Sequence, residues 1–128
     1  MKRILALVCT LGFAVSAYAG LFPDISLDSL KAAIANKSVT IIDVNGTASY
    51  NDGHIPGAIN FAADQKDLAA KLPADKSALI VAYCGSERCG AYARAAQAAK
   101  DLGYTNVQHF KPGLAGWKAS GEPLQKAE

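Results

Sequence analysis

The stretch from Ala78 to Leu102 constrains the fold most, because it combines three structural signals in direct succession. Residues 79–83 (Leu-Ile-Val-Ala-Tyr) are an uninterrupted apolar run with the length and composition of a buried strand. Residues 84–90 contain two cysteines and two glycines, which predicts a tight loop. Apolar residues at helical spacing follow, and Gly103 stands where a helix C-terminal glycine is expected. The predicted apolar face of this helix consists of Ala91, Ala95, Ala98, Ala99 and Leu102.

A strand, a tight loop and a helix in this order can hold a reactive cysteine. The helix N-terminus has unpaired backbone N–H groups and a partial positive charge, and a loop in front of it can bind an anion. Cys84 lies at the end of the predicted strand and would face that region, which favours the thiolate over the thiol. A cysteine at a strand end is also commonly a small buried apolar residue. The placement at a helix N-terminus favours the reactive interpretation.

The first 19 residues have the features of a secretory signal peptide. Met1-Lys2-Arg3 is basic, residues 4–15 are apolar, and residues 17–19 (Ala-Tyr-Ala) fit the cleavage pattern for small residues. We therefore expect cleavage after Ala19, a mature domain of residues 20–128, and a periplasmic or secreted location.

The expected mature chain has balanced charges. Of the 13 basic residues in the whole chain, two lie in the expected signal peptide, which leaves 11 basic against 11 acidic residues. This balance gives no indication of a nucleic-acid surface, and no segment of the mature chain is long and apolar enough to span a membrane.

Removal of the signal peptide leaves two of the three cysteines, Cys84 and Cys89. In an oxidising compartment they either form a disulfide with each other or remain thiols. Four residues separate them, so they do not form the C-x-x-C motif of thioredoxin-like proteins. No second pair of cysteines or histidines is present at the spacing of a zinc site, so we expect no metal.

The rest of the chain predicts strands that alternate with helices, which indicates an α/β fold with a parallel sheet. In such sheets ligands bind beyond the carboxyl ends of the strands, where the Cys84 loop lies. The predicted elements are a helix capped by Ser26, a strand at 39–44, a short helix at 48–51, a strand at 58–61, a helix capped by Asp64 and stopped by Pro73, a strand at 107–110 and a helix at 114–119.

Three segments of the chain resemble the rhodanese-like domain family, in the order and at the spacing found in that family. They are Ile42-Asp43-Val44 followed by Tyr50 and Gly53-His54-Ile55-Pro56-Gly57-Ala58-Ile59-Asn60; Tyr83-Cys84 with its loop and the helix ending at Leu102-Gly103-Tyr104; and Val107 through Pro112-Gly113-Leu114-Ala115-Gly116-Trp117 with Gly121 and Pro123.

This resemblance implies a three-layer α/β sandwich, with helices on both faces of a mostly parallel, five-stranded sheet. It implies that Cys84 takes a sulfane sulfur as a persulfide and passes it to a thiophile. The partners are then a small anionic sulfur donor and a thiol acceptor, which includes a protein thiol. No metal or organic cofactor is required. The implied substrate-binding loop consists of Gly85, Ser86, Glu87, Arg88, Cys89 and Gly90.

The loop departs from the family pattern at several positions. The family commonly has glycine at the fourth loop position and arginine at the sixth, where this chain has Glu87 and Cys89. Arg88 stands one position before the usual arginine, and Asn45 replaces an arginine that usually follows Asp43-Val44. A carboxylate at the loop rim repels an anionic donor, and Arg88 partly offsets that repulsion.

Three functions follow from these observations. The first is an exported sulfurtransferase that carries persulfide on Cys84. The second is a periplasmic thiol redox protein that uses a Cys84–Cys89 disulfide, in which Cys89 is the redox partner. The third is a non-catalytic domain that binds an anion or a protein partner at the same loop. Phosphatase chemistry on the related fold needs an arginine where this chain has Gly90.

Four further polar or aromatic residues are interpreted as structural. The Gly-His-Ile-Pro-Gly segment predicts that His54 fixes a loop by hydrogen bonds, and Asp43 at a strand end is expected to accept bonds from nearby amides. His109 lies in a predicted strand without a ligand at metal spacing. Trp117 is expected to close the core beneath the last helix.

Overall fold

The computed structural model describes residues 22–127, so the predicted signal peptide lies outside the described residues. Its helices and strands alternate, as the sequence predicts. In chain order they are α1 (Leu27–Ala35), β1 (Val39–Asp43), α2 (Thr47–Asp52), β2 (Ile59–Asn60), α3 (Phe61–Asp64), the 3-10 helix η1 (Gln65–Asp67), α4 (Leu68–Lys71), β3 (Leu79–Tyr83), α5 (Tyr92–Asp101), β4 (Val107–His109) and α6 (Gly113–Ala119).

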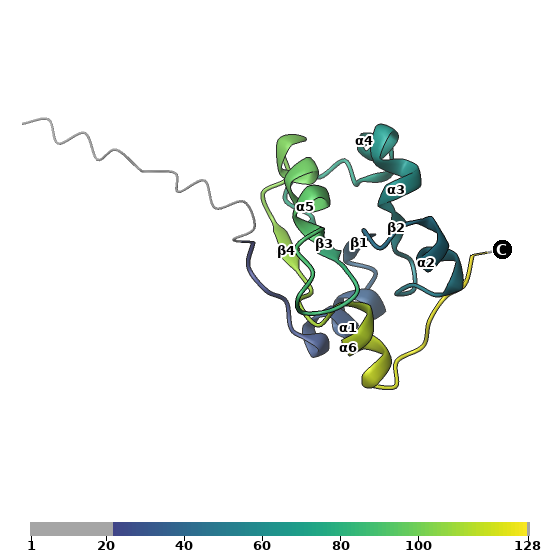
Figure 1. Cartoon of the computed structure of the whole chain (residues 1–128). Coiled ribbons are helices and arrows are strands. Elements are labelled where there is room, and N and C mark those ends of the chain that lie inside the picture. The colour runs from purple at the N-terminus through teal and green to yellow at the C-terminus, as the bar shows by residue number, and fades with distance from the viewer. Residues whose placement is uncertain (1–21, 128) are drawn as a thin grey trace, which may run out of the picture.

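The four strands form one sheet in the order β2-β1-β3-β4, and every neighbouring pair is parallel. β1 and β3 pair along their whole length, from Val39 opposite Leu79 to Asp43 opposite Tyr83. Figure 1 shows the sheet with α3, α4 and α5 on one side and α1 and α6 on the other. The predicted α/β fold with a parallel sheet and helices on both faces is therefore confirmed.

The expectation of five strands is wrong in detail, since four strands are present among residues 22–127. Where a fifth strand would lie, Asp24 forms a single parallel bridge with His109 at the outer edge of β4. The amide of Ile25 donates to His109 O at 2.9 Å, and the amide of His109 donates to Pro23 O at 2.8 Å. The pairing stays short because Pro23 has no N–H group and α1 begins at Leu27, only two residues after Ile25.

Alternate side chains of the two central strands enter two separate cores. On one face, Ile42, Ile80 and Ala82 pack with residues of α3, α4 and α5. On the other face, Val81 and Tyr83 pack with residues of α1 and α6. The strands of a parallel sheet with both faces covered are expected to read as continuous apolar runs, which explains residues 79–83.

Several helix boundaries follow the sequence signals, and two predictions are wrong. Ser26 caps α1, since its side chain accepts from the amide of Ser29 at 3.1 Å. Asp64 makes no capping hydrogen bond, because the helical segment already begins at Phe61 and is divided into α3, η1 and α4. Leu102 is 37% exposed and lies outside the packed face of α5. Gly103, at a φ of 98°, ends that helix as expected.

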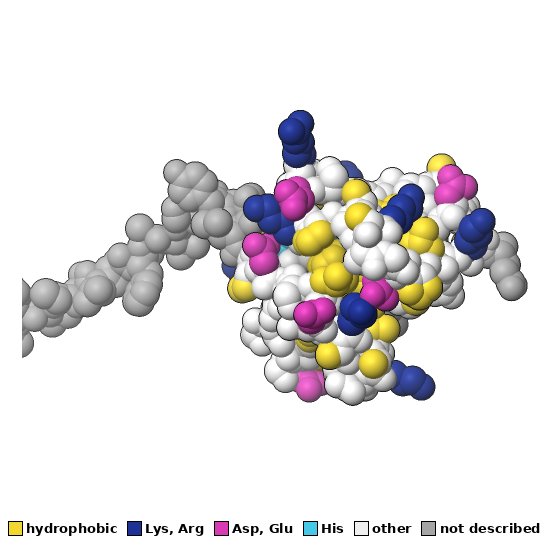
Figure 2. All heavy atoms as spheres, turned by 90° about the horizontal axis from the view of Figure 1, so that it is seen from below, with side chains coloured by type: hydrophobic (Ala, Val, Ile, Leu, Met, Phe, Trp, Pro, Cys, Tyr) yellow, Lys and Arg dark blue, Asp and Glu magenta, His cyan; other side chains and the backbone are white. Residues whose placement is uncertain are grey.

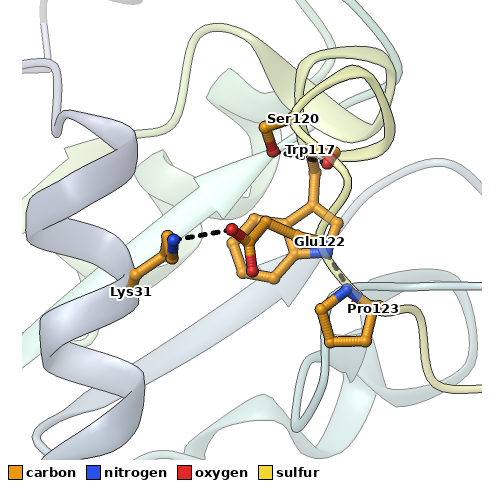
Figure 3. Close-up of polar contacts among 5 residues, drawn as sticks. All are labelled: Lys31, Trp117, Ser120, Glu122 and Pro123. Carbon is orange, nitrogen blue, oxygen red and sulfur yellow. Dashed lines mark hydrogen bonds and ion pairs between the residues drawn. The ribbon is translucent and has the colours of Figure 1, made fainter.

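The chain after α6 contacts the core that lies between the sheet, α1 and α6 (Figure 3). Trp117 is buried, as predicted, and its indole Nε1 donates to Pro123 O at 2.7 Å. Lys31 Nζ of α1 lies 2.6 Å from Glu122 Oε1, so an ion pair connects the first helix to this C-terminal segment. The Trp117 contact attaches α6, the helix that packs against the Cys84 loop, to the chain that follows it.

The surface carries charges of both signs. In the view of Figure 2, basic and acidic side chains are interspersed, with apolar side chains between them. Such mixing produces no extended field of one sign on this face. Among residues 22–127, no helix has the length and apolar character required to cross a membrane.

Candidate active site

The Cys84 loop lies at the carboxyl end of β3, next to the carboxyl end of β1. The chain leaves β1 toward β2 on one side, and then crosses to β3 on the other side of β1. This is the topological switch point of the sheet, where ligands bind in open parallel α/β folds. The position expected for the site from the sequence is therefore the position that the topology provides.

Cys84 is the buried end of the loop, and its sulfur is bonded to that of Cys89. Only 1% of Cys84 is exposed, whereas Cys89 is partly buried. The disulfide joins residues whose Cα atoms are 6.0 Å apart, a usual separation for such a bond. The backbone N–H of Tyr92, the first residue of α5, donates to Cys84 Sγ at 3.0 Å. This N–H and the N-terminus of the ten-residue helix α5 would stabilise a thiolate at Cys84 after reduction.

The first residues of α6 hold the beginning of the loop in place. The amide of Leu114 donates to Cys84 O at 2.9 Å, and the amide of Ala115 donates to Gly85 O at 2.9 Å. Gly113, at a φ of 63°, lies directly against the loop backbone. A Cβ atom at this position would lie only 2.6 Å from Cys84 O. The close approach of α6 to the loop therefore requires glycine at position 113.

The outer part of the loop lines an open groove of about 430 Å³ together with α6. Ser86, Glu87 and Arg88 form one side of this groove, and all three are exposed. The other side consists of Pro112, Ala115, Gly116 and Ala119. The groove thus combines a charged rim at Glu87 and Arg88 with an apolar wall formed by Pro112 and residues of α6.

Most backbone N–H groups of the loop are available to a ligand. The amide of Cys89 donates to Ser86 O at 3.2 Å, which forms a tight turn. In the described part of the chain, the amides of residues 85–88 and 90 donate to no protein group. Consecutive amides that precede a helix N-terminus are the usual elements of an anion-binding loop.

A buried carboxylate lies beneath the loop. Asp43 is fully buried at the end of β1, and its Oδ2 accepts from the hydroxyl of Tyr83. Its Oδ1 accepts from the amide of Asn45 at 2.7 Å, and the Tyr83 hydroxyl itself accepts from the amide of Ile55 at 3.1 Å. Burial raises the pKa of Asp43, and the hydrogen bonds from Tyr83 and Asn45 partly oppose that shift. Burial and the nearby Asp43 also raise the pKa of Tyr83, which therefore stays a donor.

The raised pKa of Asp43 predicts a specific pH dependence of stability. Between the unfolded-state pKa, about 3.9, and the raised folded-state pKa, the folded protein holds a proton that the unfolded chain has released. The free energy of unfolding should therefore fall as pH rises through that window. Asp43→Asn does not titrate there, so this part of the fall should be absent in the variant.

Urea unfolding of both proteins between about pH 4 and pH 8 measures the effect. His109 has a lowered pKa, mainly because of burial, and titrates in both proteins, so its contribution cancels in the comparison. Identical pH slopes for wild type and Asp43→Asn would contradict the assignment.

Two histidines are buried, and each stacks on a tyrosine ring. His54 Nδ1 lies 2.7 Å from Tyr50 O, to which its ring N–H donates, and the ring stacks on Tyr50 at 3.6 Å between centroids. Its backbone pairs with Gln125, so this segment fixes a loop as predicted. His109 stacks on Tyr92, and its Nδ1 lies 3.5 Å from Asp24 Oδ1. Among residues 22–127 no group of three or more His, Cys, Asp or Glu side chains is arranged to hold a metal ion.

The structure places the predicted loop residues 84–90 together at the carboxyl end of β3. Cys84 is buried, Gly85 is partly buried and residues 86–88 are exposed. It adds three features that the sequence did not reveal. These are the hydrogen bond from the Tyr92 amide to Cys84 Sγ, the hydrogen bonds from α6 to the carbonyl groups of the loop, and the Asp43–Tyr83 hydrogen bond. The sequence contains a signal for the contact between α6 and the loop, since Gly113 in Pro112-Gly113 permits a close backbone approach. Asn45 approaches the loop as well, because a Cβ at Gly85 would lie 3.3 Å from its Oδ1.

A parallel α/β sheet with a cysteine loop at its switch point and a helix N-terminus next to the sulfur defines a class of α/β domains with the site at the carboxyl ends of the strands. Comparison with known proteins identifies the family. The family model described as "Rhodanese-like domain" matches residues 26–120, so the chain belongs to the rhodanese-like domain family.

Individual relatives agree with this assignment. An HTH-type transcriptional regulator of Mycobacterium tuberculosis is 37% identical over 89 residues, which cover 69% of this chain but only 38% of that relative's length. The thiosulfate sulfurtransferase GlpE of Shewanella oneidensis is 29% identical over 99 residues and covers 75% of this chain and 92% of its own. The solution structure of a rhodanese-like domain from Anabaena superimposes with a TM-score of 0.65 at 31% identity, covering 82% of this chain and 80% of that domain. The similarity to a thiosulfate sulfurtransferase supports a sulfurtransferase-like role.

Proposed function

We propose that the reduced protein is a sulfurtransferase that carries a sulfane sulfur on Cys84. The Cys84 thiolate attacks the outer sulfur of an anionic donor such as thiosulfate, the donor's S–S bond breaks, and sulfite leaves with the bonding electrons. A thiophile, either cyanide or a thiol, then attacks the outer sulfur of the persulfide and releases the Cys84 thiolate. Both steps are nucleophilic displacements at sulfur and need no metal or organic cofactor.

The observation that carries this proposal is the position of Cys84 Sγ. It lies at the end of β3, 3.0 Å from the amide of Tyr92 at the start of α5, and next to loop amides that have no protein acceptor among residues 22–127. Such donors stabilise the thiolate, the persulfide anion and the anionic donor alike. The groove beside residues 86–88 provides a place for the acceptor thiol.

The charges at the groove rim determine how strongly an anionic donor is attracted. Arg88 attracts an anion and the adjacent Glu87 repels it, so the two side chains nearly cancel. The loop amides and the α5 N-terminus then supply most of the attraction for the donor. We infer that binding of thiosulfate is weak, and that singly charged persulfides are better donors than doubly charged thiosulfate.

The disulfide supports a location outside the cytoplasm, since such bonds persist in oxidising compartments. We propose that the protein is exported and that residues 1–19 are removed. In the oxidised form Cys84 has no free thiolate, so sulfur transfer requires reduction first.

The function is tested with the mature Cys89→Ser variant, in which Cys84 is the single thiol among residues 22–127, fully reduced and then freed of reductant. Incubation with thiosulfate or a small persulfide is expected to add about 32 Da, the mass of one sulfur atom, in the intact mass spectrum. Addition of cyanide should remove this mass and form thiocyanate. Oxidised wild type, in which Cys84 is bonded to Cys89, should show neither reaction. If the reduced variant neither gains this mass nor forms thiocyanate with either donor, the proposed function is wrong.

A further inference from the structure

We propose that Cys89 is a resolving thiol, which attacks the Cys84 persulfide and releases its outer sulfur as hydrosulfide. The protein would then reduce sulfane sulfur to sulfide, in addition to passing it to an external thiophile. This inference rests on the proposed function, because it needs a persulfide on Cys84.

The loop places the two sulfurs where this step requires them. A turn closed by the bond from Cys89 N–H to Ser86 O, at 3.2 Å, reverses the chain after Glu87 and Arg88. It brings the Cα atoms of Cys84 and Cys89 to 6.0 Å, and the two Sγ atoms are bonded. Cys89 can therefore reach the inner sulfur of a Cys84 persulfide, which is the atom it must attack to form that bond.

The difference in burial between the two cysteines assigns their roles. Cys84 is 1% exposed, so a large external thiol has poor access to its inner sulfur, whereas Cys89 on the same loop has direct access. Attack by an external thiophile is limited to the outer sulfur of the persulfide. The internal thiol and the external acceptor therefore compete for different atoms of one intermediate.

The step balances in atoms and electrons. The Cys89 thiolate forms a bond to Cys84 Sγ, the bond between Cys84 Sγ and the outer sulfur breaks, and the outer sulfur leaves with the electron pair as hydrosulfide. Cys89 is oxidised from thiol to disulfide, and the sulfane sulfur is reduced to sulfide. The product is the Cys84–Cys89 disulfide that the structure contains.

A new cycle requires a reductant, which we infer to be a dithiol. Its thiolate would attack Cys89 Sγ, because Cys89 is the more exposed residue of the pair. Cys84 would leave as a thiolate, which the Tyr92 amide and the α5 N-terminus stabilise. A second thiol of the reductant then releases Cys89. With thiosulfate as donor, the sum is thiosulfate and a dithiol giving sulfite, hydrogen sulfide and the disulfide of the reductant.

The test compares full mature wild type with Cys89→Ser and Cys89→Ala, each reduced, freed of reductant and given one equivalent of donor with no other thiol. Wild type should release about one hydrosulfide per chain and become about 2 Da lighter than its reduced form, through loss of two hydrogens. Both variants should release none and stay about 32 Da heavier. Once Cys84 carries the added sulfur, the rate constant for hydrosulfide release should not depend on protein concentration, since the attacking thiol is in the same chain.

The outcomes separate this inference from the proposed function. If wild type keeps the added sulfur and releases no hydrosulfide, the inference is wrong and the sulfurtransferase proposal stands. If either Cys89 variant releases hydrosulfide as wild type does, another thiol is the resolving group and the inference is wrong again. If no protein gains sulfur or releases hydrosulfide, both proposals fail together. Two different substitutions are used so that misfolding of one variant does not decide the result. Circular dichroism spectra of both variants, compared with wild type, check that they are folded.

Discussion

Replacing Cys84 with serine is expected to abolish sulfur transfer. A serine hydroxyl is not ionised near neutral pH and does not form a persulfide, so the backbone donors around position 84 have no nucleophile to activate. Loss of a nucleophile that works together with its surroundings typically lowers turnover by about a thousandfold or more. We expect thiocyanate formation by Cys84→Ser at the level of the uncatalysed reaction, and no added sulfur in its intact mass.

Reduced wild type is the matched control for this variant, because both lack the Cys84–Cys89 disulfide. The two should unfold at similar urea concentrations, which would show that the loss concerns chemistry and not folding. Cys84→Ser that keeps more than about a tenth of the wild-type turnover, or that gains sulfur on Cys89, would show that Cys84 is not the sulfur carrier.

Replacing Gly113 with alanine is expected to cause the largest loss of stability among single changes near the loop. The new Cβ would lie 2.6 Å from Cys84 O, 2.9 Å from Ser86 N and 3.0 Å from Gly85 C. These are backbone atoms, so the loop or α6 must move as a whole. We expect a loss of roughly 3 kcal/mol in the free energy of unfolding, together with loss of sulfur transfer, because the bonds from α6 to Cys84 O and Gly85 O would break.

Gly121 provides the control for backbone strain. Its φ of 79° is close to the 63° of Gly113, but a Cβ at Gly121 would have no atom within 4 Å. Gly121→Ala therefore carries the strain of a left-handed conformation alone, about 1 kcal/mol, and should retain sulfur transfer. Urea denaturation and the thiocyanate assay measure both variants. Equal losses in the two would mean that conformation, and not contact with the loop, explains the need for glycine at 113.

The sequence predicts the fold well where the signal is local. Residues 79–83 form the strand that their continuous apolar character indicates, and Ser26 caps α1 through its own side chain. The failures arise where tertiary contacts decide. Asp64 loses its expected capping role because Phe61, which is buried in the core, already starts a helical turn, and Leu102 stays exposed although it lies at the right spacing.

For the site, the sequence predicts the position of the Cys84 loop but not the contacts that hold it. Asp43 and Tyr83 are 40 residues apart, and only the strand register places them opposite each other. The amides of Leu114 and Ala115 reach the loop from a helix some 30 residues farther along the chain. Such contacts depend on how separate elements pack, and residue patterns carry little information about them.

The hold of α6 on Cys84 O and Gly85 O has a consequence for protein engineering. Cys84 is fixed from two sides, by α6 at its carbonyl and by the Tyr92 amide at its sulfur. The exposed segment 86–88 takes part in neither the hydrogen bonds from α6 nor the hydrogen bond from the Tyr92 amide. Its side chains can therefore be changed without removing these hydrogen bonds. If Cys84 carries the sulfur as proposed, segments of other composition grafted between Gly85 and Cys89 would therefore change which donors and acceptors the domain selects while leaving Cys84 Sγ in place.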